Sequence, residues 1–232
     1  IYFVTSPMLV MAIAHYYHRS VIAVTHHDRL RSFFLLMLNV TGMLLAGSRN
    51  NILVSLLLPL SLWFLHSNYK TVMVAVSGML LVAAVIVFQA QLRAFFDPEE
   101  LSNAHKIQLV QDYYDLFGDS LSSLLLGQGL GAYHLWTNKG MFYISELTYF
   151  ELIRNFGIFG ALVVLALLLV PIARAFGRDR ADPTATLAFG YAYYLLMCAS
   201  NPNMFSSMGI LILSLMLVVS FRPTSDWQPY RL

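Results

Sequence analysis

The chain has 232 residues, of which 58% are hydrophobic and 11% are charged, and its net charge is +2. Because soluble domains carry about 25% charged residues, this composition excludes an ordinary soluble domain and predicts an integral membrane protein. The small net charge gives no reason to expect a nucleic-acid partner. The single cysteine, Cys198, allows no internal disulfide and is typical of a small buried apolar side chain.

Seven apolar stretches are candidates for membrane-spanning helices, each of which needs about 20 apolar residues. They lie near residues 1–16, 32–47, 51–66, 71–94, 147–171, 184–200 and 204–220. We therefore expect an all-α fold, in which residues 1–232 form a single polytopic transmembrane helix bundle with a long loop at residues 95–146. Because the sequence begins inside an apolar run at Ile1, we expect it to be the C-terminal part of a longer polytopic protein.

The lysine and arginine residues are divided unequally between the two sides of the predicted spans. Nine lie in one set of connections and four in the other, and the richer side is expected to be cytoplasmic. The poorer side holds the long loop, the turn around Arg49 and the turn around Asn201. We expect these three segments to face away from the cytoplasm, where they could line one site.

The long loop is expected to contain a helix. Asp97 followed by Pro98 is typical of a helix start, with the aspartate as the N-cap and the proline in the first turn. Apolar residues then recur at near-helical spacing up to Gly118. The pattern predicts an amphipathic helix over residues 98–117 that lies on the outer membrane surface. Lys106 on this helix is interpreted either as a solvated charge or as a group that docks a phosphate.

The loop ends in a glycine-rich turn, Gly127-Gln128-Gly129-Leu130-Gly131. A nucleotide-binding loop is disfavoured because no strand pattern precedes the turn and no βαβ unit surrounds it. We interpret the segment as a tight re-entrant or surface turn whose exposed backbone N–H groups bind an anion such as a phosphate. A plain glycine turn without a ligand is the alternative.

The helix predicted after the loop carries charged residues at the start of an apolar run, beginning at Glu146. Helical spacing places Glu146, Tyr149 and Arg154 on one face, with Gly157 one turn further on. A charge at membrane depth is costly and usually faces a cavity or a pathway. Glu151 lies three residues before Arg154, so the alternative is a structural ion pair that fixes helix packing.

Arg49 lies in Ser48-Arg49-Asn50-Asn51 between two short spans. It is a candidate phosphate ligand because a guanidinium binds phosphate oxygens bidentately, and the alternative is an arginine that extends towards the lipid headgroups. His134 in the long loop is a second candidate catalytic residue. We expect no metal site, because no cysteines or carboxylate cluster at ligand spacing accompany the remaining histidine pairs, His15/His18 and His26/His27.

Four motifs, taken in order, resemble the bacterial O-antigen polymerase and ligase family over about residues 30–220. They are Gly47-Ser48-Arg49-Asn50-Asn51 at a span boundary, Leu126 to Gly131 at the end of the outer loop, Ser145-Glu146 through Phe156-Gly157, and Asn201-Pro202 between the last two spans. The resemblance implies a multispanning glycosyltransferase of the bacterial inner membrane that needs no metal or other cofactor and faces the periplasm. Its substrates would be undecaprenyl-diphosphate-linked glycans, and a chain-length regulator is a further candidate partner.

Ligases of this family typically have a histidine where this chain has Glu146, so the glutamate favours the polymerase branch. The resemblance then implies that Glu146 deprotonates the acceptor hydroxyl, while Arg49 and Arg154 stabilise the departing diphosphate. The predicted substrate-binding residues are the glycine turn, Tyr149, His134 and Lys106, which stands where many relatives have an arginine. An O-antigen ligase and a lipid-linked sugar transporter or flippase are the alternatives. The transporter is disfavoured because the sequence shows no internal repeat.

Overall fold

The computed structural model describes most of the chain. The described residues are 6–46, 48–67, 78, 97, 100–132, 134–136, 140–142, 145–179, 182–199, 201–202 and 204–223. Apart from the single position 78, the span predicted at residues 71–94 lies outside them.

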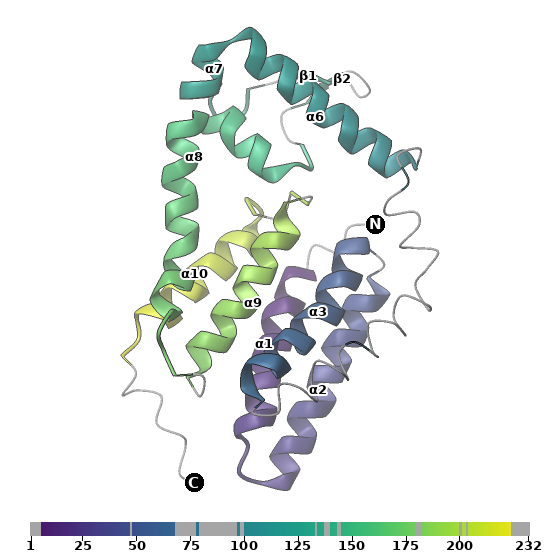
Figure 1. Ribbon diagram of the computed structural model, residues 1–232, viewed down its shortest axis with the longest axis vertical. Helices are drawn as coiled ribbons and strands as arrows, with labels where there is room; N and C mark the ends of the chain where they lie inside the picture. Colours follow the sequence, from purple (N-terminus) through teal and green to yellow (C-terminus); the bar gives the residue numbers. More distant parts are fainter. Residues whose placement is uncertain are drawn as a thin grey trace. The chain divides into compact units, whose positions relative to one another are not determined.

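The described chain is helical apart from one small hairpin (Figure 1). Its helices are α1 (Ser6–Ile22), α2 (His26–Leu45), α3 (Arg49–His66), α6 (Leu101–Asp119), α7 (Leu121–Leu126), α8 (Thr148–Ala175), α9 (Pro183–Cys198) and α10 (Ser207–Phe221). The antiparallel strands β1 (His134–Trp136) and β2 (Gly140–Phe142) form the hairpin. The predicted helical fold class is therefore confirmed, and six of the seven predicted apolar stretches coincide with α1, α2, α3, α8, α9 and α10.

The chain divides into two compact units. The first unit comprises residues 1–83, 170–197 and 205–232, and the second comprises residues 84–169 and 198–204. Helix α8 passes from the second unit into the first between Leu169 and Val170. The second unit therefore holds the long loop and the start of the helix that follows it, which are the segments where the sequence predicts function.

The first unit is a helical bundle with an apolar core. A Cβ atom added at Gly190 of α9 would lie 2.6 Å from the Cβ of Ala14, so a glycine is needed for α1 and α9 to approach this closely. The Ser61 hydroxyl of α3 lies 2.7 Å from that of Tyr193 on α9. The core side chains with no exposed surface include Val10, Ile13, Ala14, Met43, Leu58, Leu62, Tyr191 and Ile212.

Serine and threonine side chains cap several helices, as their chemistry predicts. The Ser48 hydroxyl accepts a hydrogen bond from the Asn51 N–H at the start of α3, at 3.2 Å. Thr25 caps α2 in the same way. Part of the Ser48-Arg49-Asn50-Asn51 motif is therefore explained by helix capping, and this cap makes Arg49 the first residue of α3.

Helix α6 confirms the helix predicted in the long loop but begins three residues later than predicted. The Glu100 carboxylate, and not Asp97, accepts from the Asn103 N–H, at 3.2 Å. The Asp97 carbonyl instead accepts from the Asn103 side-chain amide, at 2.6 Å. One face of α6 is buried through Leu109 and Tyr113, which pack with Leu147.

Within the part of the chain that the structure describes, α8 is the one helix that is both long and apolar enough to cross a membrane. The apolar helices at Asn50–His66 and Ser207–Phe221 are shorter. Only 22% of the most apolar stretch of α8 is buried within the chain. A core helix of a soluble protein would be mostly buried, so the exposure of α8 favours contact with lipid. The arrangement with seven spans stays a prediction.

Candidate functional site

Glu146 lies in the turn before α8 and not on the helix itself, which begins at Thr148. The prediction that Glu146 shares a helical face with Tyr149 and Arg154 is therefore wrong. The Ser145 hydroxyl accepts from the Leu147 N–H at 3.1 Å, and the Thr148 N–H donates to the Glu146 carbonyl at 3.1 Å. These bonds hold the turn at the helix entrance, where Glu146 and Tyr149 are both half-buried.

The turn is anchored from the other side by the segment between α9 and α10. The Thr148 hydroxyl is buried and donates to the backbone carbonyl of Asn201 at 2.7 Å. This bond joins the third and fourth motifs of the sequence, which are more than fifty residues apart and both belong to the second unit. The Asn201-Pro202 motif thereby gains a structural role in fixing the start of α8.

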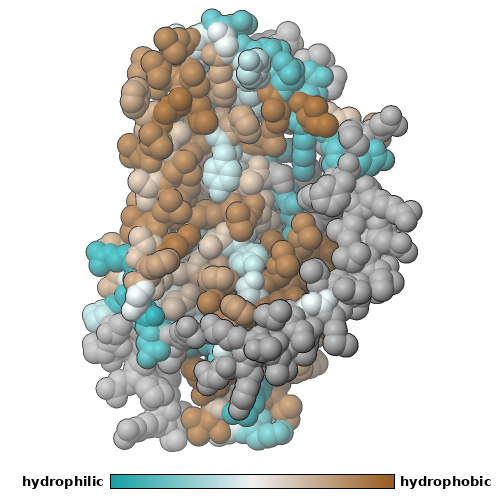
Figure 2. All heavy atoms as spheres, in the orientation of Figure 1, coloured by the Kyte–Doolittle hydropathy of each residue, from teal (hydrophilic) through white to brown (hydrophobic). Residues whose placement is uncertain are grey.

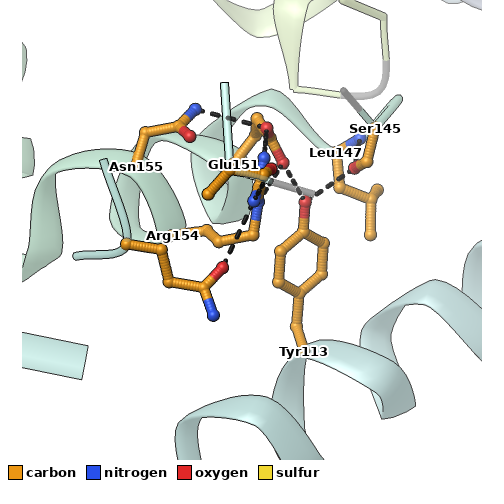
Figure 3. A network of polar contacts seen from close by, with 8 residues as sticks. Tyr113, Ser145, Leu147, Glu151, Arg154 and Asn155 are labelled. Atoms are coloured by element: carbon orange, nitrogen blue, oxygen red, sulfur yellow. Dashed lines mark hydrogen bonds and ion pairs between the residues drawn. The ribbon is translucent and has the colours of Figure 1, made fainter. Parts of the chain in front are cut away.

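An ion pair between Glu151 and Arg154 is buried in the first turns of α8 (Figure 3). The two residues are 3% and 0% exposed. The Arg154 guanidinium donates from Nη2 to Glu151 Oε1 and from Nε to Oε2 at 3.0 Å. The Asn155 side-chain amide donates to Oε1 at 3.2 Å. A buried charge has to be paired and hydrogen-bonded to be tolerated, and this carboxylate meets both conditions.

Tyr113 of α6 reaches the same carboxylate from across the unit (Figure 3). Its hydroxyl oxygen lies 2.7 Å from Glu151 Oε2 and 2.8 Å from Ser145 Oγ. Since an ionised carboxylate only accepts, the phenol proton goes to Glu151 and the serine hydroxyl supplies the second bond. Burial, together with the nearby Glu151 charge, raises the pKa of Tyr113 above its ordinary value. The phenol therefore stays protonated as a donor.

The opposite edge of the Arg154 guanidinium holds the glycine-rich turn. Its Nη1 donates to the Ala132 carbonyl at 2.7 Å and to Gln128 Oε1 at 3.2 Å. A guanidinium has five N–H groups, and that of Arg154 donates four hydrogen bonds to protein oxygens. We therefore assign Arg154 a positioning role, because a fully buried guanidinium engaged on both edges does not meet a substrate phosphate in this arrangement.

The helical path of α8 is interrupted at Gly157, which has φ 66° and ψ 176°. The interruption releases backbone carbonyls, and the glycine turn satisfies two of them. The Gln128 N–H donates to the Arg154 carbonyl at 2.7 Å, and the Gly129 N–H donates to the Asn155 carbonyl at 3.1 Å. The prediction that the N–H groups of this turn are exposed to an anion is thus wrong for both residues.

Two glycines make this backbone contact possible. A Cβ at Gly157 would lie 2.1 Å from the Leu125 carbonyl oxygen, and a Cβ at Gly127 would lie 2.5 Å from the Asn155 carbonyl oxygen. Both glycines also have positive φ values, which favour glycine. Gly129 and Gly131 share the positive φ but have open space around them. Gly127 and Gly157 are therefore packing residues. The open space at Gly129 and Gly131 keeps both as candidates for substrate contact, but not through the Gly129 N–H, which is bonded to Asn155.

The other predicted site residues are distributed over both units. Lys106 lies half-buried on α6. His134 opens β1, opposite Phe142, and Arg49 opens α3 in the first unit. For His134 and Arg49 the structure describes the backbone and not the side chain.

Sequence reasoning missed the partners of the ion pair. In the sequence, Tyr113 follows the apolar spacing of the loop helix, and no pattern marks Gln128 or Asn155 as a partner of the ion pair. One available indication was Glu151 itself, since a carboxylate inside an apolar helix requires donors beyond a single arginine. The sequence does not reveal which distant residues supply them.

The chain matches no protein-family model, no curated protein and no solved structure. The resemblance to the O-antigen polymerase and ligase family therefore rests on the four sequence motifs. Function has to be argued from those motifs together with the geometry around Glu146 and α8.

Proposed function

We propose that the chain is part of a polytopic membrane glycosyltransferase that polymerises lipid-linked oligosaccharide repeat units at the periplasmic face of the bacterial inner membrane. The donor is a growing glycan on undecaprenyl diphosphate, and a second lipid-linked repeat unit supplies the acceptor hydroxyl. The order of the four motifs supports this proposal, as does an exposed apolar helix that follows directly on the candidate base.

The observation that carries the proposal is the contrast between two carboxylates at the entrance of α8. Glu151 is 3% exposed and is bonded to Tyr113, Arg154 and Asn155. Glu146 is half-buried in the preceding turn. A general base has to reach the proton that it removes, directly or through one water. Of these two carboxylates, Glu146 is the accessible one, and we assign it as the base.

The reaction transfers one glycosyl group with no change of oxidation state. Glu146 takes the proton from the acceptor hydroxyl as its oxygen bonds to the anomeric carbon of the donor. The bond between that carbon and the diphosphate oxygen breaks, and undecaprenyl diphosphate leaves with the bonding electrons. Negative charge thus grows on the diphosphate, and cationic groups placed against it lower the barrier.

Arg49 and Lys106 are the proposed cations for the diphosphate, on the strength of the sequence motifs. Arg154 does not take this role, because its guanidinium is already hydrogen-bonded to Glu151, Gln128 and Ala132. His134, Tyr149, Gly129 and Gly131 remain proposed substrate contacts.

The buried network gives Arg154 a second way to influence the reaction. Ser145, next to Glu146, bonds both to Tyr113 and to the Leu147 N–H. Catalytic groups have to be held to within about 0.5 Å, and neighbouring residues with locked side chains provide this precision. The network therefore positions the base without touching the substrate.

Deleting the gene and examining the surface polysaccharide tests the proposal. Loss of polymer, with single repeat units still attached to the lipid A-core or to their carrier, supports a polymerase. Complete loss of attached glycan, with polymer still formed on its carrier, would instead indicate a ligase. Repeat units that stay on the cytoplasmic face would indicate a transporter, and unchanged polysaccharide would exclude all three.

A further inference from the structure

The short helix α7 and the glycine turn after it present an uncharged apolar surface. Leu121, Leu126 and Leu130 are 67%, 73% and 75% exposed. No charged residue occurs between Ser120 and Ala132. Single exposed leucines are ordinary on a protein surface, but three of them on one short uncharged segment require a covering.

Helix α8 supplies a continuation of this surface. Its exposed apolar side chains Phe159, Leu162 and Val163 recur at helical spacing and are 62%, 59% and 71% exposed. Figure 2 shows the hydrophobic surface of α8 continuing onto the region of α7. Because α8 is the helix long and apolar enough to span a membrane within the described chain, lipid is the material that covers this face.

The contact between Gly127 and Gly157 fixes the depth of α7 along the span. From Gly157 to Ala173 the helix carries no charged side chain. At 1.5 Å per residue this segment is about 25 Å long, close to the hydrocarbon thickness of about 30 Å. The hydrocarbon region therefore begins near Gly157, and Leu125 packs directly on that residue. Arg154 lies one turn before it, outside the charge-free segment.

The backbone hydrogen bonds around Gly157 are of the kind that a lipid environment requires. Irregular backbone at membrane depth is tolerated only where its polar groups are paired within the protein. The break in α8 leaves the carbonyls of Arg154 and Asn155 without helical partners, and the N–H groups of Gln128 and Gly129 pair with them.

We propose that α7 and Leu130 form a re-entrant segment that inserts its leucines into the bilayer at the N-terminal end of α8. The segment is a lipid-binding surface that keeps the base-bearing turn at the level of the headgroups. This inference rests on α8 as a membrane span and is independent of which reaction the protein catalyses.

Spin-label accessibility in reconstituted vesicles tests this surface. Single cysteines at positions 121, 126 and 130, in a Cys198→Ala background, are labelled with a nitroxide. Collisions with oxygen, which concentrates in lipid, are compared with those of a water-soluble nickel complex. Asp119 is an exposed neighbour at the end of α6, and a label there serves as the matched control. Oxygen should dominate at positions 121, 126 and 130, and nickel at position 119.

Nickel accessibility at positions 121 and 126 equal to that at position 119 would overturn the proposal, because the leucines would then face water. Low accessibility to both reagents would also overturn it, since a protein partner or a second copy would then cover them. Each labelled variant should elute from size exclusion as the unlabelled protein does. The side chains at the labelled positions are exposed, and all variants share the replacement of the buried Cys198, so the labels themselves are not expected to cause loss of folding.

Discussion

Each unit of the molecule contains a buried polar cluster that joins different helices, and the two clusters are built differently. In the second unit, Glu151 and Arg154 are charged and are bonded at short distances to groups from α6, α8 and the glycine turn. In the first unit, His18, Thr186 and His66 join α1, α9 and α3 at distances of 3.3 and 3.4 Å. The Glu151–Arg154 network of the second unit is charged and closely bonded, whereas the histidine cluster of the first unit is neutral and loosely bonded.

The histidine cluster leaves one of its atoms unsatisfied. His66 Nδ1 lies 2.9 Å from the Leu62 carbonyl, so this nitrogen carries the proton and Nε2 accepts from Thr186. His18 Nδ1 then donates to the threonine oxygen, and His18 Nε2 is buried without a hydrogen-bond partner among the described residues. Burying one neutral imidazole nitrogen without a hydrogen bond costs about 1–3 kcal/mol of folding free energy.

The difference shows where the fold depends on polar contacts. Removing one partner of a buried ion pair costs about 3–5 kcal/mol, because the remaining charge is left uncompensated. Weak neutral hydrogen bonds contribute about 0.5–1.5 kcal/mol each. Substitutions in the charged network should therefore have much larger effects than those in the histidine cluster.

The largest effect is expected for Arg154→Met, which leaves the Glu151 carboxylate buried and frees the Ala132 carbonyl. The free energy of unfolding should fall by about 3–5 kcal/mol, measured by chemical unfolding in detergent micelles. The matched control is the double variant Glu151→Leu/Arg154→Met, which removes both charges and should lose less than the single variant. A double variant that loses the sum of both single changes would show that the pair is not coupled.

The next effect is expected for Gly157→Ala, which places a methyl group against the Leu125 carbonyl oxygen at a residue with φ 66°. The left-handed backbone costs about 1–2 kcal/mol, and the clash adds about 1–3 kcal/mol. Gly129→Ala, with φ 89° and open space, should lose only the first amount. Equal losses in thermal unfolding of the two variants would contradict the close contact between Gly157 and the Leu125 carbonyl.

Tyr113→Phe removes the donor from α6 and should destabilise the protein by about 1.5–3 kcal/mol, the usual range for a hydrogen bond to a charged group. Tyr114→Phe is the matched control, because Tyr114 is 74% exposed on the same helix. Unfolding midpoints of the two variants should differ clearly. If they coincide, α6 is not held to α8 through this phenol.

The smallest effect is expected for Thr186→Val in the histidine cluster. It removes two long hydrogen bonds while keeping the side-chain shape, so the loss should stay within about 1–3 kcal/mol for the two bonds together. Thr186→Ser, which restores the hydroxyl, should recover part of it. A loss as large as that of Arg154→Met would mean that the two clusters are equally important to the fold.

Local patterns in the sequence predicted most of the helices. Apolar runs place α3, α8, α9 and α10 within a few residues of their observed bounds, because burial in lipid or in a core requires continuous apolar faces. Asp97 and Pro98 predict the start of α6 to within a few residues, but the carboxylate that caps the helix is that of Glu100. Which of several nearby acidic residues caps a helix depends on the local path of the chain.

The interior of the site could not be predicted in the same way. The break at Gly157 depends on a backbone contact with Leu125, more than thirty residues earlier. The engagement of Arg154 depends on Ala132 and Gln128, which approach it only because the glycine turn folds back on α8. The alternative of a structural ion pair with Glu151 was recognised from their spacing, but its partners come from tertiary contacts.

The assignment of Glu146 as the base and Glu151 as a structural residue is tested most directly by comparing Glu146→Gln with Glu151→Gln. The measurement is the polymerisation rate on purified lipid-linked repeat units in vesicles, together with the unfolding midpoint of each variant. Glu146→Gln should lower the rate by about 10²- to 10⁴-fold, the usual contribution of a general base, with an unchanged midpoint, whereas Glu151→Gln should lower the midpoint. Polymerisation by Glu146→Gln at the rate of the unmodified protein, with normal folding, would contradict the account.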